Sequence, residues 1–433
     1  MVRTLLAVLA VCASISVFAQ GNHIDIIRHD APALARFGEY DIGVRTLELT
    51  DRNRPDILNT AEGGETAFYD RRLIVEVWYP ALLAEGQPPG GEYTATTRNL
   101  AVTATLRGRA VRDAAALTSA GAMPLIIVSH GYPGNRHLMS HLGENLASKG
   151  YVVVAIDHRD STYENWQPVA STLYNRPLDQ LFVLDQMATM SNDDSSFLSG
   201  MVDAEHTGIV GYSMGGYGLI NNLGGGFSDL LVTHEQAPVN ALAFRHAAAN
   251  PKYRGKLDSR IKAGFAVAPW GMAEGVWNPD DLKGIEVPTF YLAGSVDTTA
   301  GYEDGIRVIF ESATKSDRYL LTYVNAGHNA GAPIPVPVEI LSSDDQSGAS
   351  HYTDPVWDSV RMNNIMDHFA TAFFDYQLKG KKESLTYLRL VPDSQNGVYS
   401  VENEQETDAH TYWKGFAKGT ARGLVLEHLG PVE

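Results

Sequence analysis

Residues 206–216 read His-Thr-Gly-Ile-Val-Gly-Tyr-Ser-Met-Gly-Gly, and this stretch decides the fold. Its first half is a short apolar run typical of a buried strand, and a helical pattern follows Ser213. Gly211-Tyr-Ser-Met-Gly215 matches G-x-S-x-G, in which a serine occupies a sharp turn between a strand and a helix. Side chains at positions 211 and 215 would collide with the neighbouring strand and helix, so both positions require glycine. A five-residue pattern can arise by chance, so the case depends on the residues around it.

Further strand patterns lie on both sides of this turn. Pro124–Ser129 and Tyr151–Ile156 are continuous apolar runs, as expected for strands of a parallel sheet that is buried on both faces. Lys262–Ala268, Thr289–Ala293 and Tyr319–Val324 are three more candidate strands. Because these strands alternate with helical patterns, residues 124–325 predict an α/β fold with a doubly wound, mostly parallel sheet.

Helices are expected between the strands and near the end of the chain. Asn135–Lys149 has a helical pattern that stops at Gly150. Pro177 stands where a proline in the first turn of a helix belongs, and apolar residues then recur at helical spacing over Leu178–Met190. Two more helices are expected at Met214–Leu223 and Trp357–Lys379.

Other segments do not fit the alternation of strands and helices. Residues 20–65 show no strong periodicity, and residues 84–95 have the Gly and Pro content of a loop. Leu73–Tyr79 is a candidate strand, which Pro80 is expected to stop. Residues 224–260 are long and contain helical pieces, which indicates a cap insertion over the site or, alternatively, a surface excursion without a role in binding. A C-terminal extension begins at about residue 381.

The composition excludes some classes of protein. The chain has 433 residues, 44% of them hydrophobic and 20% charged, which is ordinary for a globular protein. Its formal net charge of −17 repels phosphate backbones, so we expect no nucleic-acid partner. The single cysteine, Cys12, lies in an apolar N-terminal segment, so the rest of the chain can form no disulfide.

The N-terminus has the pattern of a signal peptide. Arg3 supplies a positive charge, Leu5–Phe18 is apolar but short for a bilayer, and Val17-Phe-Ala19 is a small-x-small cleavage pattern. We therefore expect residues 1–19 to be removed and residues 20–433 to form one exported domain, periplasmic or secreted, without a stable membrane anchor. The alternative is a short membrane anchor.

Two residues that follow later strands complete a chemical pattern with Ser213. A serine needs a neighbouring base to become a nucleophile, and in folds with this turn the chain order is serine, acid, histidine. Asp297 follows the strand Thr289–Ala293, and His328 follows the strand Tyr319–Val324. We therefore expect Ser213, Asp297 and His328 to be catalytic, with Asp297 orienting the imidazole. The alternative for Asp297 is a helix N-cap for the segment after it, and the two roles are compatible.

Alternatives to the acid and the base exist in the sequence. Glu303 or Asp304 could replace Asp297, and His351 could replace His328. His130 and His158 precede the serine and break the chain order. We interpret His130 as a structural residue beneath the loop that follows Ser129.

An acyl-transfer site also needs donors for the oxyanion that develops on the substrate. The backbone N–H of Met214 supplies one donor by its position after the serine, and we expect the backbone N–H of Tyr132 to supply the second. Tyr212 and Trp270 are candidates for binding substrate, although either could be ordinary packing. The sequence contains no metal-binding motif and no dinucleotide motif, so no metal and no cofactor are expected.

Several segments together resemble a known family. They are Trp78-Tyr-Pro-Ala81, Pro124–Gly131, Leu146–Val153, Arg176-Pro-Leu-Asp179, Gly211–Gly216 and the expected helix through Gly380. In these the chain resembles the dienelactone-hydrolase-like branch of the α/β hydrolases, which includes relatives of the platelet-activating-factor acetylhydrolases. The resemblance covers residues 70–425 and implies an α/β-hydrolase fold and a cofactor-free serine esterase acting on short acyl esters.

The chain departs from that family at two points. Dienelactone hydrolases use a cysteine nucleophile, whereas this chain has Ser213. The acetylhydrolases place the acid at the stretch Ala266–Trp270, which contains no acidic residue here, so Asp297 is favoured and a phospholipid substrate is not. The Gly211–Gly216 turn and Tyr132 are also similar to bacterial polyester hydrolases, which are shorter and usually carry a disulfide, so this second resemblance ranks lower.

Together these patterns predict hydrolysis of carboxylic esters through an acyl-enzyme intermediate, with a small-molecule or lipid-like ester as substrate. An amidase, a peptidase or a polyester hydrolase could use the same three residues. A noncatalytic binding protein on the same scaffold is the alternative from another class. The sequence leaves the ester, the acyl length and the oligomeric state open.

Overall fold

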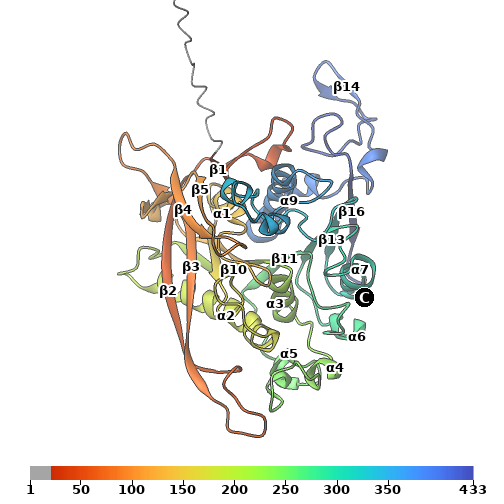
Figure 1. The fold of residues 1–433 in the computed structure, drawn as a ribbon. Helices are drawn as coiled ribbons and strands as arrows, with labels where there is room; N and C mark the ends of the chain where they lie inside the picture. The colour runs from red at the N-terminus through yellow and green to blue at the C-terminus, as the bar shows by residue number, and fades with distance from the viewer. Residues whose placement is uncertain (1–20, 433) are drawn as a thin grey trace, which may run out of the picture.

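A computed structural model describes residues 21–432, and a mixed sheet forms its centre (Figure 1). The strand order is β16-β13-β12-β11-β10-β8-β9-β3-β2-β6, with β7 paired to β3. The strands in chain order are β2 (Asp41–Pro55), β3 (Phe68–Leu82), β6 (Val111–Arg112), β7 (Ala115–Ala116), β8 (Met123–Ser129), β9 (Val152–Asp157), β10 (Val202–Tyr212), β11 (Ile261–Val267), β12 (Thr289–Gly294), β13 (Arg318–Tyr323) and β16 (Leu424–Leu429).

The middle of the sheet is parallel from β9 through β8, β10, β11 and β12 to β13. β3 and β16 flank this part in antiparallel orientation. All residues of β8, β12 and β13 are buried, as continuous apolar runs in a two-sided sheet require. The doubly wound, mostly parallel sheet expected from the sequence is confirmed, because every strand expected between residues 124 and 325 is present within a few residues.

Helices cover both faces of the sheet. α1 (Ser140–Ala147) packs against the long helix α9 (Ser359–Lys379), and α2 (Val169–Asn192) packs against α3 (Met214–Asn222). The strands run between these two pairs (Figure 1). The shorter helices are α4 (Asp229–Val232), α5 (Pro251–Arg254), α6 (Pro279–Leu282), α7 (Arg307–Ser312) and α8 (Val338–Leu341).

Pro177 lies inside α2, and the expectation that it sits in the first turn of a helix was wrong. The helix begins at Val169, eight residues earlier, because residues before the proline continue its buried face. A proline in a helix interior leaves the carbonyl four residues earlier without its donor. Here the hydroxyl of Tyr217 on α3 donates to that carbonyl, on Leu173, at 2.6 Å.

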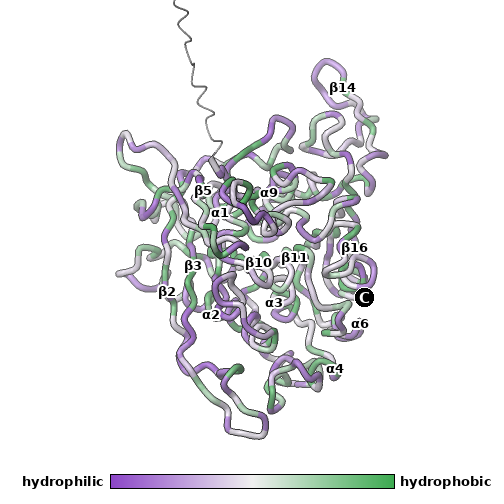
Figure 2. The backbone as a smooth tube through the Cα atoms, viewed as in Figure 1, coloured by the Kyte–Doolittle hydropathy of each residue, from purple (hydrophilic) through white to green (hydrophobic). Residues whose placement is uncertain are grey.

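The hairpin of β2 and β3 was only partly expected. β2 lies in the stretch that shows no strong periodicity, because its buried and exposed residues alternate irregularly. Pro80 does not end β3, which continues to Leu82 and pairs Pro80 with Ile42. Since the pairing of β3 with β9 ends at Trp78, the missing N–H of Pro80 costs no hydrogen bond on that side. The part of the hairpin that extends beyond the other strands is mainly hydrophilic (Figure 2).

The segment 224–260 packs against α2 and α3. It contains α4, the 3-10 turn Leu242–His246 and α5. Nε2 of His246 lies 3.2 Å from the carbonyl oxygen of Tyr174 in α2, and Phe227 stacks on Tyr217 of α3. This segment therefore lies beside the helices.

The residues after α9 return to the sheet. A short hairpin of β14 (Val401–Glu402) and β15 (Gln405–Glu406) projects from the body (Figure 1). β16 then pairs antiparallel with β13, so the extension expected from about residue 381 supplies an edge strand of the main sheet. Near the other end of the chain, β1 (Asn22–His23), β5 (Thr103–Gly108) and β4 (Gly91–Thr96) form a small separate sheet, with β4 lying partly in the expected loop 84–95.

The predicted signal peptide, residues 1–19, lies outside the described residues. Between residues 21 and 432, no helix combines the length and apolar character that crossing a bilayer requires.

Candidate active site

Ser213 occupies the turn between β10 and α3. Its φ of 53° places it in the left-handed region, where a residue other than glycine is strained. A Cβ atom on Gly215 would lie 2.0 Å from the carbonyl oxygen of Ser129 in β8, and one on Gly211 would lie 2.3 Å from the carbonyl oxygen of Gly215. The two glycines therefore allow the close approach of strand, turn and helix that the pattern requires.

The structure brings Asp297 and His328 to Ser213. Nε2 of His328 lies 3.0 Å from Oγ of Ser213, and Nδ1 of His328 lies 2.8 Å from Oδ2 of Asp297. Asp297 follows β12 and His328 follows β13, so neighbouring parallel strands deliver both side chains to the carboxyl edge of the sheet. Hydrogen bonding to the carboxylate leaves Nε2 free to accept the serine proton.

Asp297 is held by its own turn as well as by His328. Its Oδ1 accepts hydrogen bonds from the backbone N–H groups of Thr299 at 2.8 Å and Ala300 at 3.0 Å. Burial alone would raise the pKa of Asp297, but the hydrogen bonds from His328 and from these two amides outweigh burial and hold the pKa below its usual value. The carboxyl group is therefore ionised at neutral pH, as orientation of an imidazole requires.

The two candidate oxyanion donors belong to peptide units whose carbonyl groups are occupied. The carbonyl oxygen of Ser213 accepts from the backbone N–H of Trp270 at 3.2 Å, and the carbonyl oxygen of Gly131 lies 2.7 Å from Nδ1 of His130. Within residues 21–432 the amides of Met214 and Tyr132 donate to no other group of the chain. Both N–H groups are therefore available to an oxyanion at Ser213.

A cavity of about 740 Å³ opens at Ser213 and His328. Besides these two residues it is lined by their chain neighbours and by residues from four further parts of the chain, namely Arg98, Asn99, Leu100, Gly131, Tyr132, Tyr212, Thr299, Gly327, Asn329, Asp345, Ser347, Gly348, Ser350, His351, Thr353, Asp354 and Pro355. Tyr212 is among them, and its ring centroid lies 5.2 Å from that of His328.

Two expectations about the cavity differ from the structure. No residue of 224–260 lines the cavity, because this insertion packs on α2 and α3. The walls come instead from residues 98–100 and 345–355. Trp270 is also absent from the lining: its ring lies 6.4 Å from that of Tyr217, towards α3. The cap and the substrate contact of Trp270 are therefore not features of this cavity.

Asn329 and Asp354 are site residues that the sequence analysis missed. Asn329 accepts a hydrogen bond from the hydroxyl of Tyr212 and donates to the carbonyl oxygens of Ser350 and Thr353. Asp354 accepts from the backbone N–H of Gly327 at 2.7 Å. Both tie residues 350–354 to the loop that carries His328. The position of Asn329 directly after His328 was the one available signal.

The alternative acids and base lie away from the hydrogen-bonded triad. Glu303 and Asp304 belong to the turn Tyr302–Ile306, where the side chain of Glu303 is exposed near Arg307. His351 lines the cavity but packs edge-on against Tyr163, and burial lowers its pKa to about 4. Within the described residues, none of the three hydrogen-bonds to Ser213 or His328.

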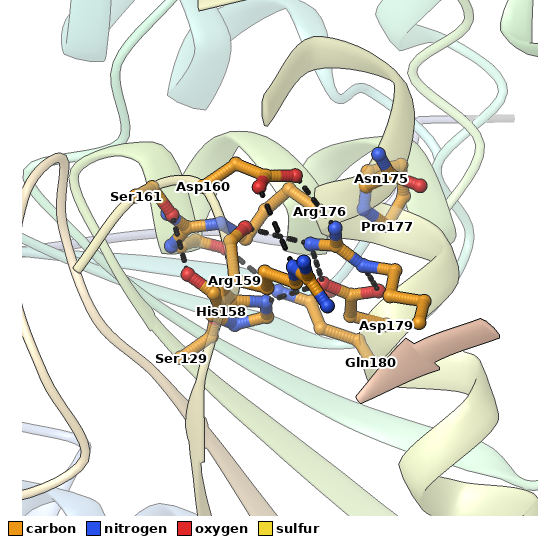
Figure 3. A network of polar contacts seen from close by, with 12 residues as sticks. Ser129, His158, Arg159, Asp160, Ser161, Asn175, Arg176, Pro177, Asp179 and Gln180 are labelled. Carbon is orange, nitrogen blue, oxygen red and sulfur yellow. Dashed lines mark hydrogen bonds and ion pairs between the residues drawn. The ribbon is translucent and has the colours of Figure 1, made fainter. Parts of the chain in front are cut away.

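A second serine–histidine–aspartate arrangement lies beneath the loop of residues 130–132 (Figure 3). Oγ of Ser129 lies 2.8 Å from Nε2 of His158, whose Nδ1 lies 3.1 Å from Oδ2 of Asp179. All three side chains are at most 1% exposed, and none lines the cavity. No substrate can reach Ser129, so the geometry of three side chains does not by itself define the site.

Comparisons with known proteins agree with this description. Residues 88–244 match the family described as PET hydrolase-like. The cutinase est1 of Thermobifida alba is 28% identical over 206 residues, which cover 47% of this chain and 53% of that protein. The cutinase cut1 of Thermobifida fusca is 26% identical over 191 residues, which cover 44% of each chain. The chain thus spans about half the length of the curated relatives it matches.

A solved structure supports the fold over a longer range. A ferulic acid esterase from Streptomyces cinnamoneus superposes with a TM-score of 0.53 at 21% identity, covering 83% of this chain and 94% of that one. The similarities in sequence favour the resemblance to bacterial polyester hydrolases, the second of the two that the sequence suggests. Strand order and the strained serine turn are those of the α/β-hydrolase fold, and these similarities agree with that fold.

Proposed function

We propose that this protein hydrolyses carboxylic esters through an acyl-enzyme intermediate on Ser213. The observation that carries the proposal is the continuous chain of hydrogen bonds from Ser213 through His328 to the ionised Asp297 at an open cavity. A buried carboxylate that fixes the histidine tautomer is what a serine nucleophile requires.

The reaction follows from the geometry. His328 takes the proton of the Ser213 hydroxyl as the oxygen attacks the ester carbonyl, and the N–H groups of Tyr132 and Met214 stabilise the oxyanion. His328 then donates the proton to the departing alcohol, which leaves an acyl group on Ser213. A water molecule, deprotonated by His328, then attacks that acyl group, and the acid is released as His328 returns the proton to the Ser213 oxygen. Asp297 stays ionised throughout and stabilises the imidazolium.

The lining of the cavity supports an ester with polar groups near the scissile bond. Arg98, Asn329 and His351 line it together with Tyr132 and Tyr212. At its side the rings of Tyr132 and Trp166 lie edge-on at 5.8 Å, and Arg98 lies over Trp166 at 4.7 Å. Small-molecule esters fit this cavity, and the similarity to PET hydrolase-like proteins and cutinases favours a polyester as the second candidate substrate.

The proposal is tested with p-nitrophenyl acetate and butyrate. Ser213→Ala is expected to lower kcat by at least about 10³-fold at unchanged thermal stability, because the nucleophile is lost. A fluorophosphonate probe is expected to label the wild type on Ser213. Turnover like that of the wild type in the variant would overturn the assignment.

Comparing one acyl group as ester and as anilide decides between esterase and amidase. Product release from a polyester film tests the second candidate substrate.

We also propose that the protein is exported. The positive charge of Arg3, the apolar run Leu5–Phe18 and the Val17-Phe-Ala19 pattern support removal of residues 1–19. N-terminal sequencing of protein secreted by a bacterial host is expected to begin at Gln20. Protein that stays in the cytoplasm with Met1 intact would overturn this proposal.

A further inference from the structure

Arg176 lies behind the loop that carries one of the two oxyanion donors. Its side chain is 1% exposed and reaches from α2 to the loop after β8. One terminal nitrogen donates to the carbonyl oxygen of His130, and the other donates to the carbonyl oxygen of Gly131 at 3.2 Å and to Oγ of Ser161 at 2.7 Å. A buried cation therefore contacts two successive backbone carbonyls of this loop.

The carbonyl group of Gly131 and the N–H group of Tyr132 belong to one peptide unit. A peptide unit is planar and trans here, so its C=O and N–H point in opposite directions. Arg176 on α2 and Nδ1 of His130, at 2.7 Å, together fix this carbonyl, which directs the Tyr132 N–H towards Ser213 and the cavity. A charged donor on the carbonyl also polarises the peptide, which strengthens its N–H as a donor.

A second charged residue on the same turn of α2 binds groups beneath the loop. Three residues after Arg176, Asp179 accepts two hydrogen bonds from Arg71, both at 2.8 Å, and one from Nδ1 of His158. Burial alone would raise the pKa of Asp179, but Arg71 and His158 hold it well below its usual range. The backbone N–H of His158 in turn donates to Nε2 of His130 at 3.2 Å. Asp179 and His158 are thus held by hydrogen bonds beneath the loop (Figure 3).

The same helix also holds the serine turn. Gln180 donates to the carbonyl oxygen of Gly215 at 3.0 Å, and its own side-chain oxygen accepts from Asn222 at 2.8 Å. One turn of α2 therefore contacts the backbone of both loops that carry the candidate oxyanion donors.

We propose that Arg176 is a positioning residue of the oxyanion hole, acting through the Gly131–Tyr132 peptide to aim and polarise the Tyr132 N–H. The inference rests on the proposed ester hydrolysis. It also assigns a role to the Arg176-Pro-Leu-Asp179 motif, which the triad leaves unexplained: Arg176 holds the donor loop, and Asp179 anchors the surrounding charges.

Arg176→Gln and Arg176→Lys test the proposal, with Arg318→Gln as the matched control. Arg318 is also a buried arginine that donates to backbone carbonyls, those of Phe310, Ser316 and Gly430, but it lies at the opposite end of the sheet from Ser213. Each protein is titrated for active sites, and kcat and KM are measured for an ester and for the matching thionoester. Sulfur accepts hydrogen bonds weakly, so the thionoester depends less on the oxyanion donors.

Arg176→Gln is expected to lower kcat for the ester by about 10- to 100-fold with KM within about threefold, and to lower the ester-to-thionoester ratio of kcat/KM at least about fivefold. Arg176→Lys is expected to recover part of the loss in kcat and part of the loss in the ratio. If Arg176→Gln does not fold, Arg176→Lys is compared with the wild type in its place. Arg318→Gln is expected to lower the Tm but leave kcat and the ratio unchanged.

Equal losses on both substrates, or unchanged kcat in the folded Arg176 variants, would overturn the positioning role while leaving the esterase proposal intact. A wild type that hydrolyses no ester, or whose turnover survives Ser213→Ala, would overturn the proposed function and this inference together.

Discussion

The hydroxyl oxygen of Ser129 lies 2.8 Å from Nε2 of His158, closer than the hydroxyl oxygen of Ser213 lies to Nε2 of His328, at 3.0 Å. Each histidine also contacts an aspartate through Nδ1. The two arrangements differ in access, because only the pair of Ser213 and His328 lines the cavity. Access and the available amide donors therefore separate the proposed nucleophile, Ser213, from the buried Ser129.

Ser129→Ala tests this distinction. The variant leaves Nε2 of the buried His158 without a donor, so the free energy of unfolding is expected to fall by about 1–3 kcal/mol. Labelling by a fluorophosphonate probe is expected to persist, with the label on the peptide that contains Ser213, as peptide mass spectrometry would show. A label on the Ser129 peptide of the wild type, or a folded Ser129→Ala protein that is no longer labelled, would contradict the interpretation.

Pro177 and Tyr217 are expected to be energetically coupled. Tyr217→Phe removes the donor to the Leu173 carbonyl and is expected to cost about 1–3 kcal/mol of unfolding free energy. In a Pro177→Ala background the new backbone N–H of residue 177 can donate to the Leu173 carbonyl, so Tyr217→Phe is expected to cost less unfolding free energy. Urea denaturation of the four proteins of this double-mutant cycle measures the coupling, expected at about 0.5 kcal/mol or more.

Tyr79→Phe is the matched control for this cycle. The hydroxyl of Tyr79 also donates to a backbone carbonyl at 2.9 Å, but this carbonyl belongs to Ala114, between β6 and β7, and not to α2. The loss of unfolding free energy in Tyr79→Phe is expected to add to that in Pro177→Ala. Additivity of Tyr217→Phe with Pro177→Ala would show that the tyrosine does not replace the missing helical hydrogen bond.

Buried histidines are expected to make the fold sensitive to acid. Burial lowers the pKa of His246 to about 3, whereas an unfolded histidine titrates at about 6.5. Between these values the unfolded state binds more protons, so the contribution of His246 to stability is present above pH 6.5 and is lost as the pH falls towards 3. His246→Gln is expected to reduce the loss of unfolding free energy between pH 6 and pH 4 by up to about 1.4 kcal/mol per pH unit.

Urea titrations at several pH values measure this slope. The wild type under the same conditions is the reference for the slope. If the unfolding free energy of His246→Gln changes with pH as steeply as that of the wild type, His246 is not responsible for the acid sensitivity.

Gly215→Ala is expected to damage both stability and activity. The added Cβ would lie 2.0 Å from the carbonyl oxygen of Ser129, so strand and turn must separate, at a cost of about 1–3 kcal/mol. The same displacement moves Ser213 and the Met214 amide, and kcat is expected to fall by at least about 100-fold. Gly430→Ala, where a Cβ meets no atom within 4 Å, is expected to change neither. A Gly215→Ala variant with the Tm and kcat of the wild type would contradict this packing argument.

Sequence patterns were sufficient where local signals are strong. The apolar runs now seen as β8, β9, β11, β12 and β13 were predicted to within one residue at each end, because strands buried on both faces admit few polar residues. The strand β10 begins four residues before the predicted His206, because residues 203–205 are mostly polar and at least partly exposed. β2 was missed because only part of its length is buried, and its polar residues hide the period of a strand. α2 was predicted to begin too late because Pro177 is tolerated inside it only through a contact with Tyr217, 40 residues later.

The sequence by itself determined the α/β fold class and the positions of Ser213, Asp297 and His328 at the ends of three parallel strands. It could do so because parallel strands deliver the residues that follow them to one edge of the sheet. Only the tertiary structure decided that the arrangement at Ser129 is sealed, that residues 224–260 and the Trp270 side chain lie away from the cavity, and that Arg176 reaches the Gly131 carbonyl. Access and long-range contacts depend on how elements distant in the chain pack together, and local periodicity carries no record of that packing.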